Sequence, residues 1–224
     1  MKRYAIIVAG GSGSRMNSEI PKQFLLLANK PVLFHTLEAF AAAAPLELIL
    51  VLPENQISYW ERLRQDYNWH LPHQVVTGGD TRFHSVKKGL ELVSDPDSLI
   101  AVHDGVRPLV TASLINNCFE EAGLFGSAVA AVPLKDSIRA IGPTSNGPLD
   151  REAFRLVQTP QAFRSEWMKK AFLADYQPFF TDCASVLEYA GFDIHLSKGD
   201  YKNLKITTPE DLALAEVLVG RSEV

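Results

Sequence analysis

Short, almost continuously apolar segments alternate along this chain with longer segments of helical periodicity. Five apolar segments predict strands: RYAIIVA (3–9), ELILVLP (47–53), HQVVTG (73–78), LIAVHDG (99–105) and SAVAAVP (127–133). Because they show no polar alternation, both of their faces should be covered. The intervening segments predict helices at 32–44, 55–67, 81–93 and 111–122. This order is typical of an open, mostly parallel α/β sheet flanked by helices, a Rossmann-like arrangement that binds ligands beyond the carboxyl ends of its strands.

The pattern changes after the fifth strand. Residues 136–141 alternate, residues 142–150 are rich in turn formers, and residues 153–159 are again extended, which predicts a β-hairpin outside the main sheet. We therefore predict a protruding β-arm over residues 135–159, which has little core of its own and favours pairing with a second copy of the chain. The remaining sequence predicts helices near 165–174 and 182–189, strands at 193–198 and 203–206, and a last helix with Thr208 as N-cap and Pro209 as first residue.

The composition predicts a protein that needs no covalent cross-links. With 224 residues, of which 46% are hydrophobic, the chain can bury roughly 70% of its unfolded surface, so we expect one domain over residues 1–224. A net charge of −4 without long runs of like charge argues against nucleic acid or an anionic membrane as the main partner. Cys118 and Cys183 lack metal-site spacing, and no signal peptide or membrane-length apolar run is visible. We expect a cytoplasmic protein with free thiols.

The segment AGGSGSR directly follows the first predicted strand. Gly10, Gly11 and Gly13 leave backbone N–H groups able to converge on an anion. The segment matches neither the Walker A motif nor G-x-G-x-x-G, which disfavours P-loop hydrolysis and hydride transfer. Arg15 and Lys22 add two fixed cations, which suits a triphosphate whose charge grows during transfer. A tight turn with two surface cations is the alternative interpretation.

Asp104 is the candidate carboxylate of this site. It ends the fourth predicted strand, and the carboxyl ends of parallel strands are where ligands bind in such sheets. The alternative is a turn residue, but the position after a buried strand favours a ligand role.

The glycine segment and five further motifs resemble one known family. AGGSGSRM followed by PKQ resembles the signature of sugar nucleotidyltransferases. GGDTRFHSV (78–86), VHDGVRP (102–108), QTPQAF (158–163), TDCASVLEYAGF (181–192) and NLKITTPEDLALAE (203–216) are similar to motifs of the 2-C-methyl-D-erythritol 4-phosphate cytidylyltransferases. The resemblance covers nearly the whole chain in order. It implies transfer of a cytidylyl group from CTP to 2-C-methyl-D-erythritol 4-phosphate, with release of pyrophosphate, in non-mevalonate isoprenoid biosynthesis.

The resemblance also implies site residues, a metal and an assembly. It assigns CTP binding to Ala9, Gly10, Gly11, Gly13, Arg15, Lys22, Gly79, Asp80, Ser85, Asp104 and Gly105. It assigns the polyol phosphate to Asp104, Arg107, Ser137, Arg151, Thr159 and Lys205. Arg15, Lys22, Arg151 and Lys205 would be catalytic. Mg²⁺ would be held mainly by the CTP phosphates, with Asp104 nearby, and the enzyme would be a homodimer formed through its arm.

Several alternatives stand beside these assignments. Asp80 could instead cap the helix predicted at 81–93. His103 is expected to be structural, because a phosphate oxygen attacks phosphorus without losing a proton. The family often has Glu where this chain has Cys183, for which we predict no role, and Thr where it has Ser137. Ribitol 5-phosphate cytidylyltransferases share the N-terminal motifs, while a non-catalytic nucleotide-binding regulator or a dinucleotide-dependent oxidoreductase would use a similar sheet.

Overall fold

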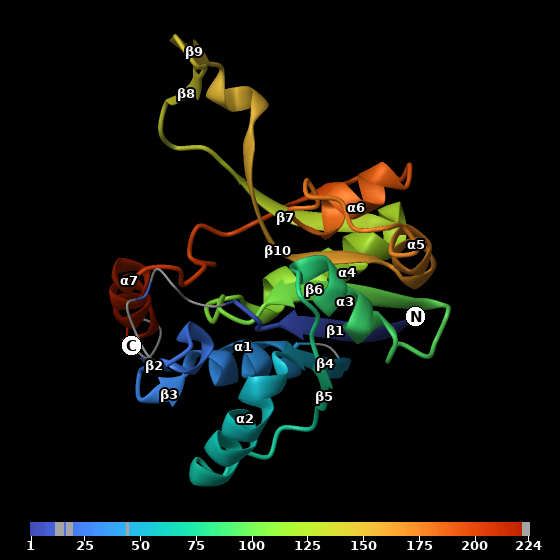
Figure 1. The fold of residues 1–224 in the computed structure, drawn as a ribbon, viewed down its shortest axis with the longest axis vertical. Helices are drawn as coiled ribbons and strands as arrows, with labels where there is room; N and C mark the ends of the chain where they lie inside the picture. The colour runs from blue at the N-terminus through green and yellow to red at the C-terminus, as the bar shows by residue number, and fades with distance from the viewer. Residues whose placement is uncertain (12–15, 17–19, 44, 221–224) are drawn as a thin grey trace.

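The computed structural model describes residues 1–11, 16, 20–43 and 45–220. Its main sheet contains β1 (Lys2–Val8), β4 (Glu47–Leu52), β5 (Gln74–Thr77), β6 (Ser98–Asp104), β7 (Ser127–Pro133), β10 (Arg155–Arg164) and β11 (Leu196–Lys198). The strand order is β11-β7-β10-β6-β1-β4-β5 (Figure 1). All pairings are parallel except those of β10, which runs antiparallel to β6 and β7. The predicted open, mostly parallel α/β sheet is confirmed.

Helices cover both faces of this sheet, which explains why the strands β1, β4, β6 and β7 are mostly apolar. One face carries α1 (Val32–Ala41), α2 (Glu54–Asp66) and α4 (Ala112–Phe125), and the other carries α3 (Arg82–Leu90), α5 (Ser165–Ala171) and α6 (Cys183–Tyr189). Successive side chains of a strand point to opposite faces. Ile7 therefore packs in the cluster with Trp60 of α2, whereas Ile6 packs in the cluster with Phe83 of α3.

The last helix, α7 (Pro209–Gly220), begins at Pro209 as predicted. The Asp211 carboxylate accepts bonds from the backbone N–H groups of Thr207 and Thr208, both at 2.8 Å. Ala215 of α7 is buried beside Leu27, which lies in a small hairpin formed by β2 (Leu26–Leu27) and β3 (Lys30–Pro31). The 3-10 helix η2 (Lys22–Phe24) precedes this hairpin. Across the described ranges, no helix has the length and apolar character needed to cross a membrane.

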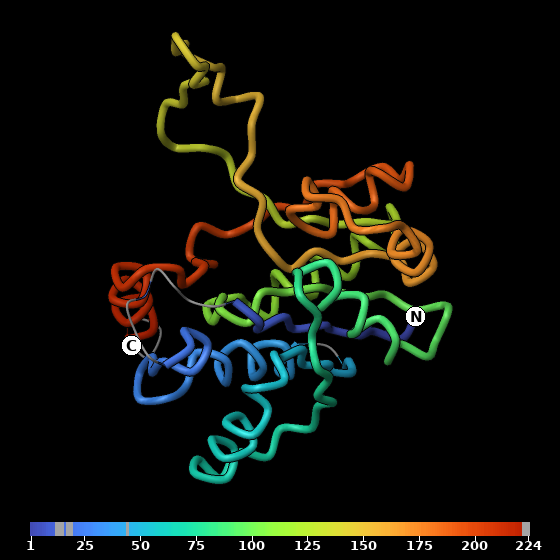
Figure 2. The backbone as a smooth tube through the Cα atoms, in the orientation of Figure 1, coloured from blue at the N-terminus to red at the C-terminus, as the bar shows by residue number. Residues whose placement is uncertain are grey.

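The arm projects from the sheet between β7 and β10 (Figures 1 and 2). It consists of β8 (Ile138–Ile141), β9 (Asn146–Leu149) and the 3-10 helix η3 (Arg151–Ala153). The prediction that residues 153–159 form its second strand is wrong. β8 pairs with β9, with Ile141 opposite Asn146, while residues 155–164 enter the main sheet as β10. Strand propensity could not distinguish these partners, because pairing depends on which chain segment lies alongside.

The strand predicted at residues 203–206 is also absent. These residues have no regular secondary structure. Ile206 donates its backbone N–H to Val106 at 2.8 Å, so the segment is attached to the loop after β6 rather than to a strand ladder.

We expect two glycines with positive φ to respond differently to substitution. Gly126, the C-cap of α4, has φ 88°, and a Cβ there would lie 2.2 Å from the Trp167 ring. Gly191 has φ 86°, but a Cβ there would have no neighbour within 4 Å among the described residues. Gly191→Ala should lower the free energy of unfolding by about 1 kcal/mol through backbone strain, and Gly126→Ala by about 3 kcal/mol through strain plus overpacking. Urea denaturation measures both, and equal losses would contradict the clash with Trp167.

Candidate active site

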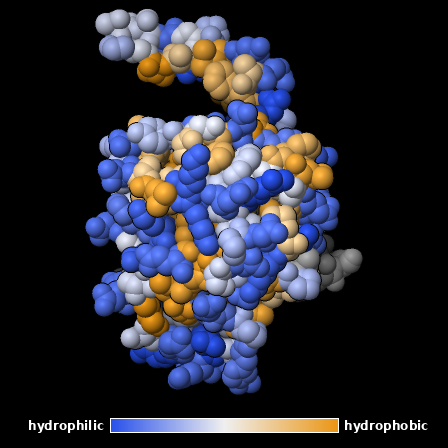
Figure 3. Space-filling view, turned by 90° about the vertical axis from the view of Figure 1, so that its right-hand side faces the viewer, coloured by the Kyte–Doolittle hydropathy of each residue, from blue (hydrophilic) through white to orange (hydrophobic). Residues whose placement is uncertain are grey.

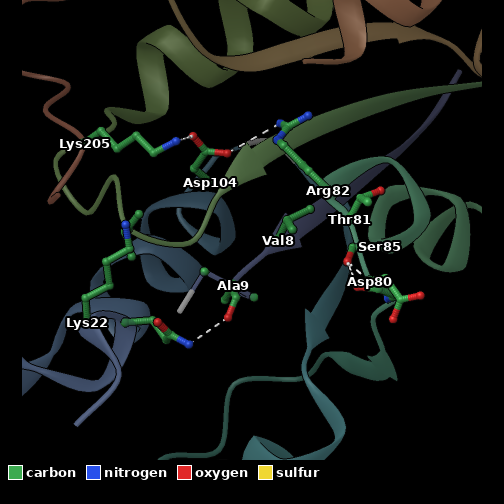
Figure 4. A pocket seen from close by; sticks show the side chains of 14 residues that line it. Val8, Ala9, Lys22, Asp80, Thr81, Arg82, Ser85, Asp104 and Lys205 are labelled. Carbon is green, nitrogen blue, oxygen red and sulfur yellow. Dashed lines mark hydrogen bonds and ion pairs between the residues drawn. The ribbon is translucent and has the colours of Figure 1, made fainter. Parts of the chain in front are cut away.

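Two adjoining cavities lie at the carboxyl ends of the central strands. β1 and β6 are parallel neighbours, and Val8 pairs with Asp104 at their carboxyl ends. The glycine segment that follows β1 therefore starts next to the Asp104 carboxylate. The first cavity is lined by most residues predicted to bind nucleotide: Ala9, Gly10, Gly11, Lys22, Gly79, Asp80, Ser85 and Asp104 (Figure 4). The second cavity is lined by Arg107 and Thr159, together with residues of β10 and of the segment before α6. Gly13 and Arg15 lie outside the described residues.

Asp104 lies between the two cavities and contacts three cations. Its Oδ2 lies 2.9 Å from Lys205 Nζ and 3.7 Å from Arg107 Nε, and its Oδ1 lies 3.5 Å from Arg82 Nη2. Figure 4 shows Arg82 and Lys205 reaching the carboxylate from opposite sides. Burial favours the neutral acid, but the charges of Arg82, Lys205 and Arg107 outweigh it and hold the pKa of Asp104 well below its usual range. Asp104 is therefore ionised at neutral pH.

His103 is a structural residue, as predicted. It is fully buried on β6, where its Nε2 lies 3.3 Å from the Arg107 carbonyl oxygen and its Nδ1 lies 3.0 Å from Thr159 Oγ1. The Thr159 hydroxyl also accepts the backbone N–H of Asp104 at 3.1 Å. Burial lowers the pKa of His103 to about 3. The neutral ring thus connects the loop after β6 to Thr159 of β10.

The loop before α3 is closed by Ser85. Its hydroxyl donates to the Gly79 carbonyl oxygen and accepts the Gly79 N–H, each at 3.2 Å. The N-cap of α3 is Thr81, whose side chain accepts the N–H of His84 at 3.3 Å. The alternative that Asp80 caps this helix is therefore wrong. Asp80 is exposed at the edge of the first cavity, where its carboxylate can meet a ligand.

Lys22 is buried in the wall of the first cavity beside the glycine segment. A Cβ on Gly11 would lie 3.5 Å from Lys22 Cε. The next residue, Gln23, donates from Nε2 to the carbonyl oxygen of Ala9 at 2.8 Å, which ties η2 to the end of β1. Gly105 lies behind this wall, and a Cβ there would lie 2.8 Å from Ala9 Cβ, so close packing requires the glycine.

Lys205 lies in the irregular segment before α7. Hydrogen bonds of the buried side chains Gln158 and Asn203 hold this segment in place. Asn203, 1% exposed, donates from Nδ2 to the Thr159 carbonyl oxygen at 2.8 Å, and its own carbonyl oxygen accepts Arg107 Nη1 at 2.8 Å. Gln158 of β10 donates from Nε2 to the Asp200 carbonyl oxygen at 2.9 Å. The segment that carries Lys205 is thus fixed to both β10 and Arg107.

Two predicted residues lie away from both cavities. Ser137 and Arg151 are exposed on the arm and line neither cavity of this chain. Arg151 donates from Nη1 to the Lys135 carbonyl oxygen at 2.8 Å within the arm.

Sequence reasoning missed Arg82, which lines both cavities. Its Nη1 donates to Cys183 Sγ at 3.3 Å, so the unassigned cysteine packs next to the site. Burial raises the pKa of the Cys183 thiol, so this group is neutral at pH 7. The only available signal was the place of Arg82 inside the GGDTRFHSV motif, at the first position of a helix.

The residues present offer limited metal ligation of their own. Within the part of the chain that the structure describes, no group of three His, Cys, Asp or Glu side chains could hold a metal ion. Asp104 is the carboxylate at the boundary of the two cavities, and its oxygens already face three cations. Mg²⁺ is often held by one or two carboxylates plus substrate phosphates, so this site suits a metal that arrives with a nucleotide.

Comparison with known proteins identifies the family. The family model described as "IspD: 2-C-methyl-D-erythritol 4-phosphate cytidylyltransferase" matches residues 4–221. The chain belongs to this family. The cytidylyltransferases named for this activity from Bacteroides thetaiotaomicron and Porphyromonas gingivalis are 46% and 48% identical to it, over 98% and 97% of this chain and 100% and 98% of theirs.

Solved cytidylyltransferases share the fold. The crystal structure of 2-C-methyl-D-erythritol 4-phosphate cytidylyltransferase from Thermus thermophilus matches 98% of this chain and all of its own, at 32% identity and a TM-score of 0.77. The 4-diphosphocytidyl-2C-methyl-D-erythritol synthase from Anaerococcus prevotii gives a TM-score of 0.82 at 26% identity, over 98% of this chain and 99% of that one. The chain is therefore an enzyme, which excludes the regulator and the oxidoreductase.

We expect His103 of this cytidylyltransferase to remain neutral across the working pH range. Its ring C2–H resonance in NMR spectra, assigned with His103→Gln, should not move between pH 8 and pH 5, because burial lowers its pKa to about 3. Unfolded histidine takes up a proton near pH 6.5 and the folded ring does not, so the free energy of unfolding should fall as pH drops from about 6.5 towards 3. His103→Gln should fall less steeply. Titration of the folded ring near pH 6.5 would contradict this assignment.

Proposed function

We propose that the two adjoining cavities bind the two substrates of the family reaction, with CTP in the first cavity and 2-C-methyl-D-erythritol 4-phosphate in the second. The chain transfers a cytidylyl group from CTP to this acceptor in non-mevalonate isoprenoid precursor biosynthesis, giving 4-diphosphocytidyl-2-C-methyl-D-erythritol and pyrophosphate. The observation that supports the assignment of cavities is their shared wall, where Asp104 contacts Lys205 between the glycine segment and β10.

The chemistry in this proposal consists of positioning and charge stabilisation. A phosphate oxygen of the acceptor attacks the α-phosphorus of CTP, and pyrophosphate leaves in line. Lys22, together with Arg15, stabilises the charge that develops on the transferring phosphoryl group. Arg107 and Lys205 hold the acceptor phosphate, while Thr159 and Asp104 meet its hydroxyl groups. The acceptor phosphate is already ionised, so no side chain needs to remove a proton.

The loop before α3 is proposed to bind the base. Gly79 and Asp80 line the first cavity beside Ser85, whose hydroxyl holds the loop closed. Backbone groups of this loop and the Asp80 carboxylate can meet the polar edge of cytosine. Asp104 and Gly105 would approach the ribose, and Gly10, Gly11 and Gly13 would surround the triphosphate with backbone N–H groups.

We also propose Mg²⁺ as the metal of the reaction. It would be held mainly by triphosphate oxygens with Asp104 nearby, and when bound it would offset the negative charge of the phosphates. The ionised state of Asp104 supports this role, although its three cationic neighbours limit how strongly it could bind a metal alone.

The arm is proposed to join two copies of the chain. Its exposed apolar side chains include Ile141, which is 80% exposed, and Leu149 and Phe154, which are 41% and 42% exposed. Figure 3 shows such hydrophobic residues on the arm, away from the body. A second copy would cover them, and Ser137 and Arg151 would then reach the partner's second cavity. In this proposal residues 1–224 form one nucleotidyltransferase domain, and residues around 135–159 make the homodimer contact.

Pyrophosphate release with CTP and each acceptor tests the function. We expect turnover with 2-C-methyl-D-erythritol 4-phosphate and much less with ribitol 5-phosphate. Lys22→Ala should lower kcat by roughly 10²–10³, with a smaller change in KM for CTP, because the lysine acts mainly on the transition state. Lys88→Ala is the matched control, since Lys88 is exposed on α3 and pairs with Glu91 at 3.1 Å. Preference for ribitol 5-phosphate would overturn the acceptor, and an unchanged kcat would overturn the role of Lys22.

Mixing two inactive variants tests whether Arg151 acts on the partner. In a co-refolded mixture of Lys22→Ala and Arg151→Ala chains, a heterodimer joins the intact body of one chain to the intact arm of the other. One of its two sites is then complete. Equal random mixing gives about half heterodimers, so roughly a quarter of wild-type activity should return. Activity no greater than the sum of the separate variants would show that Arg151 acts in its own chain or not at all.

A further inference from the structure

Arg82 lies where the two substrates must meet. Among the described residues, Arg82, Asp104 and Lys205 line both cavities. The reaction forms a bond between a group held in one cavity and a group held in the other, so side chains of the shared wall lie nearest the reacting phosphates. Asp104 and Lys205 already have roles in the proposed function, and Arg82 has none.

The Arg82 guanidinium is held in place by its surroundings. The residue opens α3 immediately after its N-cap Thr81, so the backbone that carries it is fixed by a helix start. Its Nη1 donates to Cys183 Sγ at 3.3 Å, and its Nη2 lies 3.5 Å from Asp104 Oδ1. A guanidinium carries five N–H groups, so these two contacts leave donors for a ligand. With 25% of the side chain exposed, the group is positioned but accessible.

The charge around Arg82 favours an anion. Arg82, Arg107 and Lys205 face the single carboxylate of Asp104, which leaves an excess of positive charge at the shared wall. Cys183 does not offset it, because its thiol is buried and neutral at pH 7.

The other carboxylate of the second cavity, Asp182, accepts hydrogen bonds from neighbouring residues. It accepts Gln161 Nε2 at 2.8 Å and, as the N-cap of α6, the backbone N–H of Ser185 at 2.9 Å. Its negative charge still acts on Arg82, but Arg82, Arg107 and Lys205 outnumber the two carboxylates, so a net positive charge remains for substrate oxygens.

We propose that Arg82 binds the reacting phosphates directly, bridging the acceptor phosphate and the α-phosphate of CTP across the shared wall. This role rests on the proposed function. The planar guanidinium can donate to two oxygens at once, which suits two phosphates that approach each other. As negative charge redistributes over the transferring group, a cation already fixed in position needs no reorganisation.

Kinetics of Arg82→Gln test this role, because glutamine keeps N–H donors but loses the charge and the fork. We expect kcat/KM for the acceptor to fall by about 10²-fold or more, with KM for CTP changed only a few-fold because the base-binding loop is untouched. Arg82→Lys should recover part of the loss. Arg62→Gln on α2, where the guanidinium lies over the Tyr59 ring, is the matched control and should match wild type. Wild-type protein that fails with CTP and the acceptor would refute the proposed function, whereas active wild type with unimpaired Arg82→Gln would refute only the role of Arg82.

A double-substitution cycle with Asp104→Asn separates substrate binding from a purely structural role. If Arg82 acts only by holding Asp104, adding Arg82→Gln to Asp104→Asn should cause no further loss. Direct contact with phosphate predicts a further fall in kcat/KM of about tenfold or more. Circular dichroism and thermal unfolding establish that each variant is folded. Should Arg82→Gln not fold, the same comparison is made with Arg82→Lys, for which unchanged kcat/KM would overturn the proposal.

Discussion

The buried carboxylate of Asp104 is the constraint on which the active site depends. A buried charge without partners is strongly destabilising, so cations have to be placed around it. They come from three parts of the chain: Arg107 from the loop after β6, Arg82 from the start of α3, and Lys205 from the segment before α7. The ion pairs thus bring together segments that are far apart in sequence, and they define the wall between the two cavities.

This arrangement connects stability to function. The three cations keep Asp104 ionised, and their excess positive charge is the basis on which we propose phosphate binding at this wall. The cluster is held by side chains that stay neutral at pH 7. His103 connects Thr159 to the loop that carries Arg107. Asn203 fixes the segment that carries Lys205 to the Thr159 carbonyl oxygen. A reaction that transfers a charged group without proton removal suits such a fixed environment.

Unlike the active-site cluster, the arm is not held in place by buried side chains of its own chain, as far as the described residues show. It has few buried residues, its apolar side chains are exposed, and Arg151 makes its contacts within the arm rather than in a cavity of the same chain. A two-stranded hairpin is only marginally stable alone, which is why we propose that a second copy covers its surface. In the proposed homodimer, each active site would therefore combine a body from one chain with an arm from the other.

The sequence by itself determined the features that depend on local signals. Apolar runs identified five strands of the main sheet, and Pro209 marked the start of α7. The ordered motifs identified the family. They also assigned Asp104, Arg107, Thr159 and Lys205 to one substrate, and all four line the second cavity. Only the tertiary structure decided that β8 pairs with β9 and that residues 203–206 form no strand. It also decided that Thr81 rather than Asp80 caps α3, and that Arg82 forms an ion pair with Asp104. These outcomes depend on which partner lies beside a residue, and periodicity and propensity along the chain carry no information about partners from distant segments.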